Sequence, residues 1–80
     1  MALVVFTGGL EDLTGKNKVQ VGSMIFKDII EELLQEFSQL DRDVLEGMAV
    51  AIDGEIIHSP YLETLRVDSE LHFIYKISGG

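Results

Sequence analysis

One amphipathic helix is encoded near the middle of this chain, and short runs with strand character stand on both sides of it. The apolar residues of the helix recur at intervals of three and four, so they share a single stripe. The stripe comprises Phe26, Ile29, Ile30, Leu33, Leu34 and Phe37. A helix with one apolar stripe must bury it against another element. In a chain of 80 residues the surrounding strands supply that element, and the pattern predicts an α+β domain.

The opposite face of this helix is polar and mostly acidic. Its side chains are Lys27, Asp28, Glu31, Glu32, Gln35 and Glu36. Such a face can dock a partner, but a face in contact with water is the favoured interpretation. Ser23 is the predicted N-cap, because a serine hydroxyl can accept a hydrogen bond from a free backbone N–H in the first turn.

Two strands are predicted before the helix. Residues 2–7 form an apolar run rich in β-branched side chains, which is typical of a strand. Residues 11–15 then predict a turn, or a single helical turn closed by glycine. Residues 18–21 alternate polar and apolar side chains, so Val19 and Val21 are expected to face the core.

Three more strands are predicted after the helix, and no element is assigned to the polar stretch 38–46. Residues 48–52 and 55–58 are apolar runs joined by Asp53-Gly54, a dipeptide typical of a tight hairpin turn. Residues 71–77 form the last strand, whose side chains alternate between the two faces of the sheet. Leu71, Phe73, Tyr75 and Ile77 are expected on one face, and His72, Ile74 and Lys76 on the other.

The predicted order is β-β-α-β-β-β, in one unit without a linker or repeat. The helix is expected to cross one face of a mixed sheet of about five strands. Because a helical crossover permits it, the first and last strands are expected to pair in parallel. We assign residues 1–76 to this domain and residues 77–80 to a flexible tail.

The sequence ends in Gly79-Gly80, directly after the last predicted strand. Glycine has no Cβ, so such a tail can pass through a slot too narrow for other residues. The Gly80 carboxylate is then the reacting group, and the folded domain is a handle that delivers it. A frayed end without a function is the alternative, since a dipeptide is a weak motif. Residues 77–80, fully extended, span about 13 Å, enough to enter a buried site.

The composition narrows the classes of function. The net charge of −8 disfavours binding to nucleic-acid phosphates and favours a basic surface on a protein partner. The chain contains no cysteine, which removes thiolate nucleophiles and zinc–sulfur sites and fits the cytoplasm. No apolar run is long enough to span a bilayer, so no membrane partner is expected.

An enzymatic role is not expected. His58 and His72 lie on different predicted strands without metal-ligand spacing, so no metal site is predicted. The carboxylates form no evident catalytic pair, and Gly8-Gly9 lacks the continuation of a phosphate-binding loop. No cofactor is therefore expected on this chain.

Three local motifs, together with the order of the elements, resemble one known family. The motifs are Asp12-Leu-Thr-Gly-Lys16 after the first strand, Val50-Ala-Ile-Asp-Gly-Glu55 at the hairpin and Ser78-Gly-Gly80 at the terminus. They resemble the MoaD/ThiS family of sulfur carriers, which includes the small subunit of molybdopterin synthase. The resemblance implies a ubiquitin-like β-grasp fold. Residues 71–80 depart from that family and look closer to the end of ubiquitin itself.

The resemblance also implies a mechanism. A ubiquitin-activating-type enzyme, using its own ATP and magnesium, converts the Gly80 carboxylate into an acyl-adenylate. A persulfide protein then supplies sulfur, which leaves a thiocarboxylate on Gly80. An acceptor synthase of molybdopterin or thiamin biosynthesis, or a tRNA base, receives the sulfur. The chain is thus expected to be a carrier that acts with an adenylating enzyme, or the small subunit of a synthase.

The residues expected to meet these partners lie at the end of the chain. Gly80 is the reacting residue, and the other predicted contacts are Gly79, Ser78, Ile77, Lys76, Ile74 and His72. The resemblance to ubiquitin implies an apolar recognition patch around His72 and Ile74. The alternative is that Ile74 is covered by its own neighbours.

Two other functions stay open. In the first, the chain is a protein modifier, and Gly80 forms an isopeptide bond with a lysine of a target protein. In the second, it is a β-grasp interaction module whose tail is idle. Deletion of Gly79-Gly80 separates the idle tail from the other two functions, because only an idle tail can be lost without effect.

Overall fold

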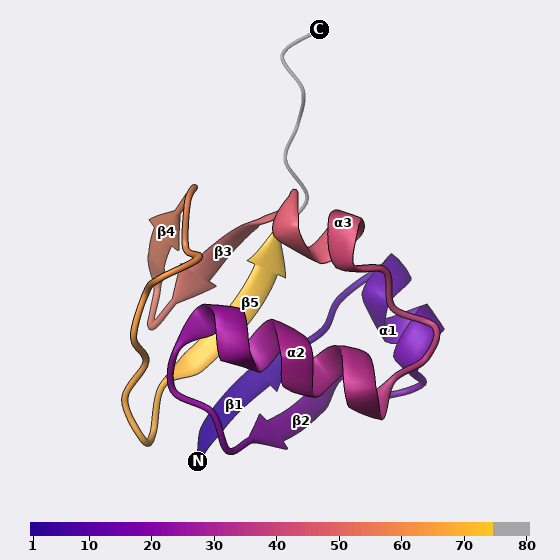
Figure 1. Cartoon of the computed structure of the whole chain (residues 1–80), viewed down its shortest axis with the longest axis horizontal. Coiled ribbons are helices and arrows are strands. Elements are labelled where there is room, and N and C mark those ends of the chain that lie inside the picture. The colour runs from indigo at the N-terminus through magenta and orange to yellow at the C-terminus, as the bar shows by residue number, and fades with distance from the viewer. Residues whose placement is uncertain (75–80) are drawn as a thin grey trace, which may run out of the picture.

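A computed structural model of the chain describes residues 1–74 (Figure 1). Within that range the strands are β1 (Ala2–Val5), β2 (Lys18–Val21), β3 (Ala49–Ile52), β4 (Glu55–Ile57) and β5 (Glu70–Ile74). The helices of the same range are α1 (Gly9–Thr14), α2 (Phe26–Glu36) and α3 (Arg42–Glu46). The predicted α+β class with one main helix is confirmed. The predicted tail, residues 77–80, lies outside the described residues, as do residues 75 and 76.

The strands form one mixed sheet in the order β2-β1-β5-β3-β4. β1 and β5 pair in parallel at the centre, with Val4 opposite Leu71. This pairing confirms the expected arrangement of the first and last strands. The other neighbouring strands are antiparallel. Figure 1 shows α2 lying across one face of the sheet, where it supplies the crossover between β2 and β3.

The apolar stripe of α2 packs on the sheet as predicted. Its buried members are Phe26, Ile29, Ile30 and Leu33, and Leu34 and Phe37 are partly buried against the same cluster. Phe73 of β5 lies beneath the helix, with its ring centroid 5.9 Å from that of Phe26. The Phe6 ring stacks on Phe73 with a centroid distance of 6.3 Å. One aromatic side chain thus joins the helix to the central strand and to the segment after β1.

The predicted N-cap of α2 is wrong. The capping position is held by Ile25, with φ −100° and ψ 134°, and no side chain caps the helix. Ile25 forms a β-bridge with Thr64, so the backbone is still extended there and the helix begins one residue later. The Ser23 hydroxyl instead donates to Glu32 Oε1 at 3.0 Å.

Backbone carbonyls of the segment after β4 cap α2 in place of a serine. The N–H of Phe26 donates to the carbonyl of Glu63 at 2.8 Å, and the N–H of Lys27 donates to the carbonyl of Tyr61 at 3.0 Å. The first N–H groups of a helix have no partner inside it. These two bonds satisfy them from a segment far along the chain, which a local sequence pattern cannot reveal.

Glu32 clamps the segment between β2 and α2. Its carboxylate accepts the backbone N–H of Gly22 at 3.0 Å and that of Ser23 at 3.1 Å, besides the Ser23 hydroxyl. The N–H of Gly22 is the main reason that the pKa of Glu32 lies below its usual value, and Ser23 lowers it further. A carboxylate whose pKa is lowered by folding stabilises the folded state above its unfolded pKa, and this contribution is lost as the pH falls through the folded pKa.

We therefore expect Glu32→Gln to reduce the free energy of unfolding by about 1 kcal/mol at pH 7, because the charge-assisted bonds to the N–H groups are weakened. The difference from wild type should shrink towards pH 3, where the wild-type carboxyl is also losing its charge. Urea unfolding at the two pH values measures this change. Glu36→Gln, on the exposed face of the same helix, is the matched control. An equal loss at both pH values would show that the charge of Glu32 is not involved.

The Asp53-Gly54 hairpin forms as predicted between β3 and β4. Asp53 has φ 52° and Gly54 has φ 88°, as a tight hairpin turn requires of both central residues. The predicted helical turn after β1 is α1, which Gly15 closes in the left-handed conformation at φ 72°.

The sequence pattern does not predict α3. This helix lies in the polar stretch 38–46 and is capped by Asp41, whose Oδ1 accepts the N–H of Asp43 at 2.9 Å. Leu40 and Leu45 anchor the stretch in the core. Five residues are too few for an apolar stripe to recur, so no helical period is visible.

Candidate partner-binding site

His72 and Ile74 lie on the face of the sheet opposite α2. Along β5, Leu71 and Phe73 are buried against the helix side, whereas His72 and Ile74 are partly exposed. The predicted alternation of this strand is therefore confirmed as far as Ile74. Because Ile74 is only partly covered, this face, here called the open face, keeps an apolar side chain available for a partner.

His72 stands at the centre of a row that crosses every strand of the sheet. It is opposite Val5 of β1 and Ala51 of β3. Val5 is in turn opposite Lys18 of β2, and Ala51 is opposite Ile56 of β4. Residues in register across neighbouring strands project from the same face. The open face therefore has His72 at its centre between two apolar side chains, a basic residue at the β2 edge and an exposed isoleucine at the β4 edge.

Small side chains on β3 leave a hollow beside His72 and Ile74. Ala49 is opposite Ile74 and Ala51 is opposite His72, so β3 presents only methyl groups to the open face. The hollow has a volume of about 520 Å³ and is lined by Thr7, Ala51, Gly54, His72, Phe73 and Ile74. The sequence pattern assigns Gly54 only to the hairpin turn and gives Ala51 no role in a binding surface, although alternate alanines in an otherwise branched strand are the signal that could have found the hollow.

A pair of polar side chains lies on the open face at the start of β5. His72 Nε2 is 2.7 Å from Glu70 Oε1, and both side chains are in contact with water. When the imidazole is protonated, this contact is an ion pair. Glu70 and His72 lie on the same face of β5 as Ile74, so a partner that covers Ile74 also meets this pair.

Asp53 fixes the position of β5 relative to the hairpin. Its Oδ1 accepts the backbone N–H of Glu70 at 2.9 Å, and its Oδ2 accepts the hydroxyl of Ser69 at 2.9 Å. The bond from the Glu70 N–H is the main reason that the pKa of Asp53 lies below its usual value, and the bond from the Ser69 hydroxyl lowers it further. Ser69 is only 2% exposed, and its carbonyl accepts the N–H of Leu3 at 2.9 Å. The start of β5 is thus held from both sides, which sets the register of His72 and Ile74.

The remaining predicted contacts are Lys76, Ile77, Ser78, Gly79 and Gly80, and they lie outside the described residues. Of the predicted site residues, the structure therefore brings together only His72 and Ile74. Residues 1–74 contain no group of three or more histidine or acidic side chains placed to hold a metal ion. In the same range no helix is long and apolar enough to cross a membrane.

Comparisons with known proteins find the same fold in several solved structures. Neither a family model nor a curated protein sequence matches the chain. The solution structure of small archaeal modifier protein 1 from Methanosarcina acetivorans superposes with a TM-score of 0.78 at 17% identity, over 99% of this chain and 95% of that one. The crystal structure of the Haloferax volcanii protein of the same name gives 0.72 at 19% identity, over 99% and 98%.

A third similar structure is described as a putative molybdopterin converting factor, subunit 1, from Pyrococcus furiosus. It superposes with a TM-score of 0.68 at 16% identity, over 95% of this chain and 97% of that one. Each of these structures matches nearly end to end, so the resemblance extends to the whole domain and not to a shared motif alone. The chain therefore has the β-grasp fold of these structures, with its mixed sheet and its single main helix.

Proposed function

We propose that this chain is a carrier protein whose Gly80 carboxylate is activated by adenylation and converted to a thiocarboxylate. The observation that supports the proposal is the end-to-end β-grasp match to small proteins named as modifiers and as a molybdopterin converting factor. In this chain the described part of the central strand β5 reaches Ile74, and Gly79-Gly80 follows within six residues along the sequence. Six extended residues reach at most about 20 Å, enough for Gly80 to enter a buried site of a docked enzyme.

The proposed chemistry needs only the carboxylate from this chain. A carboxylate oxygen of Gly80 attacks the α-phosphorus of ATP on an adenylating enzyme, and pyrophosphate leaves. Sulfide then attacks the acyl carbon, AMP leaves and a thiocarboxylate remains. If a persulfide attacks instead, AMP leaves an acyl disulfide, and a thiol of the donor protein attacks its outer sulfur, which releases the thiocarboxylate and forms a disulfide on the donor. The sulfur comes from a donor protein, because this chain has no cysteine. In this scheme the chain is a substrate and carrier rather than the catalyst, and its cytoplasmic setting fits the absence of cysteine.

Protein modification is the second candidate, and a specific observation favours it. Two of the similar structures are named small archaeal modifier proteins. In this case the amine of a target lysine, rather than sulfur, attacks the activated acyl carbon and forms an isopeptide bond. Both functions need the same terminal carboxylate and the same kind of activating partner, so the fate of the acyl group separates them.

Intact-mass analysis of the full protein, purified from its own host, tests the proposal. A sulfur carrier is expected to show a fraction in which one carboxylate oxygen is replaced by sulfur. Conjugates to other proteins, joined through Gly80, would assign the modifier role instead. Only free acid, in cells that lose no function when Gly79-Gly80 is deleted, would leave the chain as an interaction module and contradict both proposals. The same spectrum shows whether Gly80 is the last residue in the cell.

We also propose that the open face docks the activating enzyme. Ile74→Asp places a charge where an apolar contact must lose water, so we expect the affinity for that enzyme to fall about 30-fold or more, the effect of a central contact residue. The folded domain should persist, because Ile74 is partly exposed already. A binding titration against the cognate adenylating enzyme measures the effect.

Glu36→Lys on the exposed face of α2 is the matched control for Ile74→Asp. It likewise changes the charge of a single side chain, but this side chain is exposed and lies on the opposite side of the domain from Ile74. Its affinity is expected to stay within a factor of about two, as is usual for surface substitutions outside a contact. Loss of binding by the helix variant alone would place the docking surface on the acidic face of α2.

A further inference from the structure

β4 is an edge strand, and the outward direction of its backbone can be derived from the register. The N–H of Asp53 donates to the carbonyl of Glu70 at 2.9 Å, so the odd-numbered residues of β3 direct their backbone groups at β5. The even-numbered residues, Val50 and Ile52, therefore direct theirs at β4. They are opposite Ile57 and Glu55, whose backbone groups point inward in return.

Ile56 lies between those two residues, so its N–H and C=O point away from the sheet. Within residues 1–74 no backbone or side-chain group outside the strand forms a hydrogen bond with them. The Ile56 side chain is 60% exposed. An open edge with an exposed branched apolar residue is a template for pairing with another extended chain.

A groove runs beside this edge. It has a volume of about 630 Å³ and is lined by Ile52, Asp53, Glu55, Ile56, Ile57, His58, Glu63, Thr64, Arg66 and Ser69. Ile57 is opposite the buried Val50, and Glu55 is opposite Ile52, so these side chains project from the α2 side of the hairpin. The groove therefore lies between that side of the hairpin and the segment from Glu63 to Ser69, and it reaches Ile56 at the edge. Side chains that an added strand directs to the α2 side can enter it.

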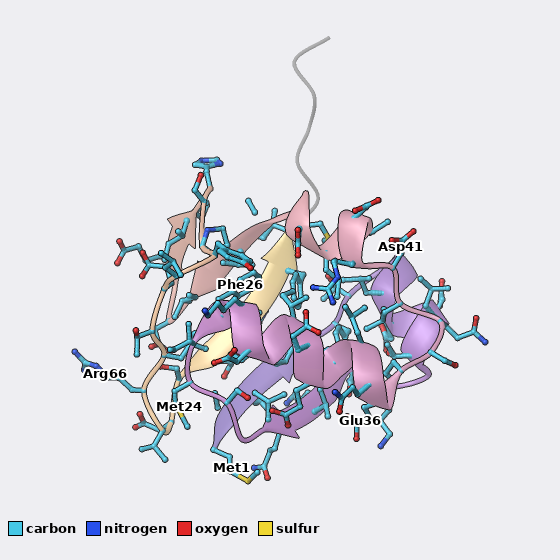
Figure 2. The ribbon with its side chains drawn as sticks, viewed as in Figure 1. Met1, Met24, Phe26, Glu36, Asp41 and Arg66 are labelled. Atoms are coloured by element: carbon cyan, nitrogen blue, oxygen red, sulfur yellow. The ribbon has the colours of Figure 1, made fainter. Side chains whose placement is uncertain are left out.

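The charge of the groove indicates what it binds. Three of the lining residues are acidic, Asp53, Glu55 and Glu63, and Arg66 is the one fixed positive charge among them. Figure 2 shows the Arg66 side chain extending away from the body of the domain. The acidic excess favours basic side chains.

We propose that the β4 edge and this groove bind an extended basic segment of a partner protein, which pairs with β4 as a further strand. Ile56 supplies one backbone donor, one acceptor and an apolar contact, in the manner of strand addition at a sheet edge. Lysine or arginine side chains of the partner lie near Glu55 and Glu63. A second copy of this chain fits less well, because pairing β4 with β4 brings like charges together in a molecule of net charge −8. The proposal does not depend on the chemistry of Gly80.

The test uses the full ¹⁵N-labelled chain and two model peptides, acetyl-Lys-Val-Lys-Val-Lys-Val-amide and its glutamate analogue. The lysine peptide is expected to shift the amide signals of Ile56 and His58 and to slow hydrogen exchange at the N–H of Ile56. The affinity should fall as salt is raised, because the attraction is partly between exposed charges. The glutamate peptide should bind at least tenfold more weakly.

Ile56→Pro removes the outward donor without removing a bond to β3, and a proline is tolerated at such a position of an edge strand. It is expected to lower the peptide affinity at least tenfold. The matched control is Gln20→Pro on β2, the opposite edge. The N–H of Phe6 donates to the carbonyl of Asn17 at 2.8 Å, which makes Lys18 and Gln20 the outward residues of β2. This control should leave peptide binding unchanged.

The double variant Glu55→Lys, Glu63→Lys keeps the test decisive if the proline variant does not fold, because both side chains are exposed. It should reverse the preference between the two peptides. Equal binding of both peptides, or no effect of either variant, would overturn the proposal. A concentration-dependent dimer, seen by analytical ultracentrifugation and abolished by Ile56→Pro, would also overturn it by assigning the edge to a second copy.

Discussion

Replacement of Gly79 or Gly80 by alanine is expected to abolish activation of the chain while the domain stays folded. If the terminus must pass through a narrow channel to reach ATP, a Cβ at either position displaces the carboxylate from the α-phosphorus. A displacement of about 1 Å is enough to slow a reaction about 10²-fold. ATP–pyrophosphate exchange, catalysed by the cognate adenylating enzyme, measures the rate directly.

Thermal unfolding is the control for these glycine variants. Within residues 1–74 the buried cluster extends from Ala2 to Phe73, and an added methyl group at position 79 or 80 removes none of the contacts among those residues. The midpoint of unfolding is expected to stay within about 1 °C of wild type, as for surface changes. Equal exchange rates for the variants and the wild type would refute the channel argument. A large fall in the midpoint would show that the tail contributes to folding.

Leu33→Ala is expected to lower the free energy of unfolding by about 2–5 kcal/mol, and Ile30→Ala by a similar amount. Both side chains are fully buried on the stripe of α2. Truncation removes apolar contacts and leaves a cavity that the surrounding sheet cannot fill completely. Small domains have about 5–15 kcal/mol of stability in total, so either change is expected to unfold a measurable fraction of the protein at physiological temperature. Urea unfolding followed by circular dichroism quantifies the loss.

Leu13→Ala is the matched surface control for the two core variants. Leu13 lies on α1 and is 48% exposed, so its truncation removes less buried area and is expected to cost less than about 1 kcal/mol. Similar losses for Leu13→Ala and Leu33→Ala would mean that the stripe of α2 is not the centre of the core. That result would contradict the packing of the apolar stripe of α2 on the sheet, which is the most specific part of the fold assignment.

The regular elements could be predicted because each has a local cause. The stripe of α2 repeats over three turns, and the Asp53-Gly54 turn requires positive φ at both residues, which the dipeptide allows. The start of α2 could not be predicted, because its first N–H groups bond to Tyr61 and Glu63 and Ser23 is engaged by Glu32. α3 could not be predicted either, because it is held by only two buried leucines, Leu40 just before it and Leu45 within it. Two residues form no repeating pattern.

The candidate site could likewise be predicted only in part. The face that carries His72 and Ile74 follows from the alternation of β5 alone. The hollow beside them depends on which residues of β3 lie opposite, and register is set by the whole sheet. The outward backbone of Ile56 likewise depends on a hydrogen bond between Asp53 and Glu70. The hollow and the outward backbone groups of Ile56 exist only in the assembled sheet, so they cannot be predicted from the sequence of residues 55–57 alone.

The central place of β5 in the sheet links completion of the domain to the order in which the chain is synthesised. Until residues 70–74 emerge, β1–β2 and β3–β4 are two separate hairpins with no common edge. β5 enters between them and pairs with Val5 on one side and Ala51 on the other through the same residue, His72. Such a late, long-range closure is slow compared with local contacts. A nascent chain therefore closes its sheet only after residues 70–74 have been made, and a chain that stops before them has two hairpins but no finished domain.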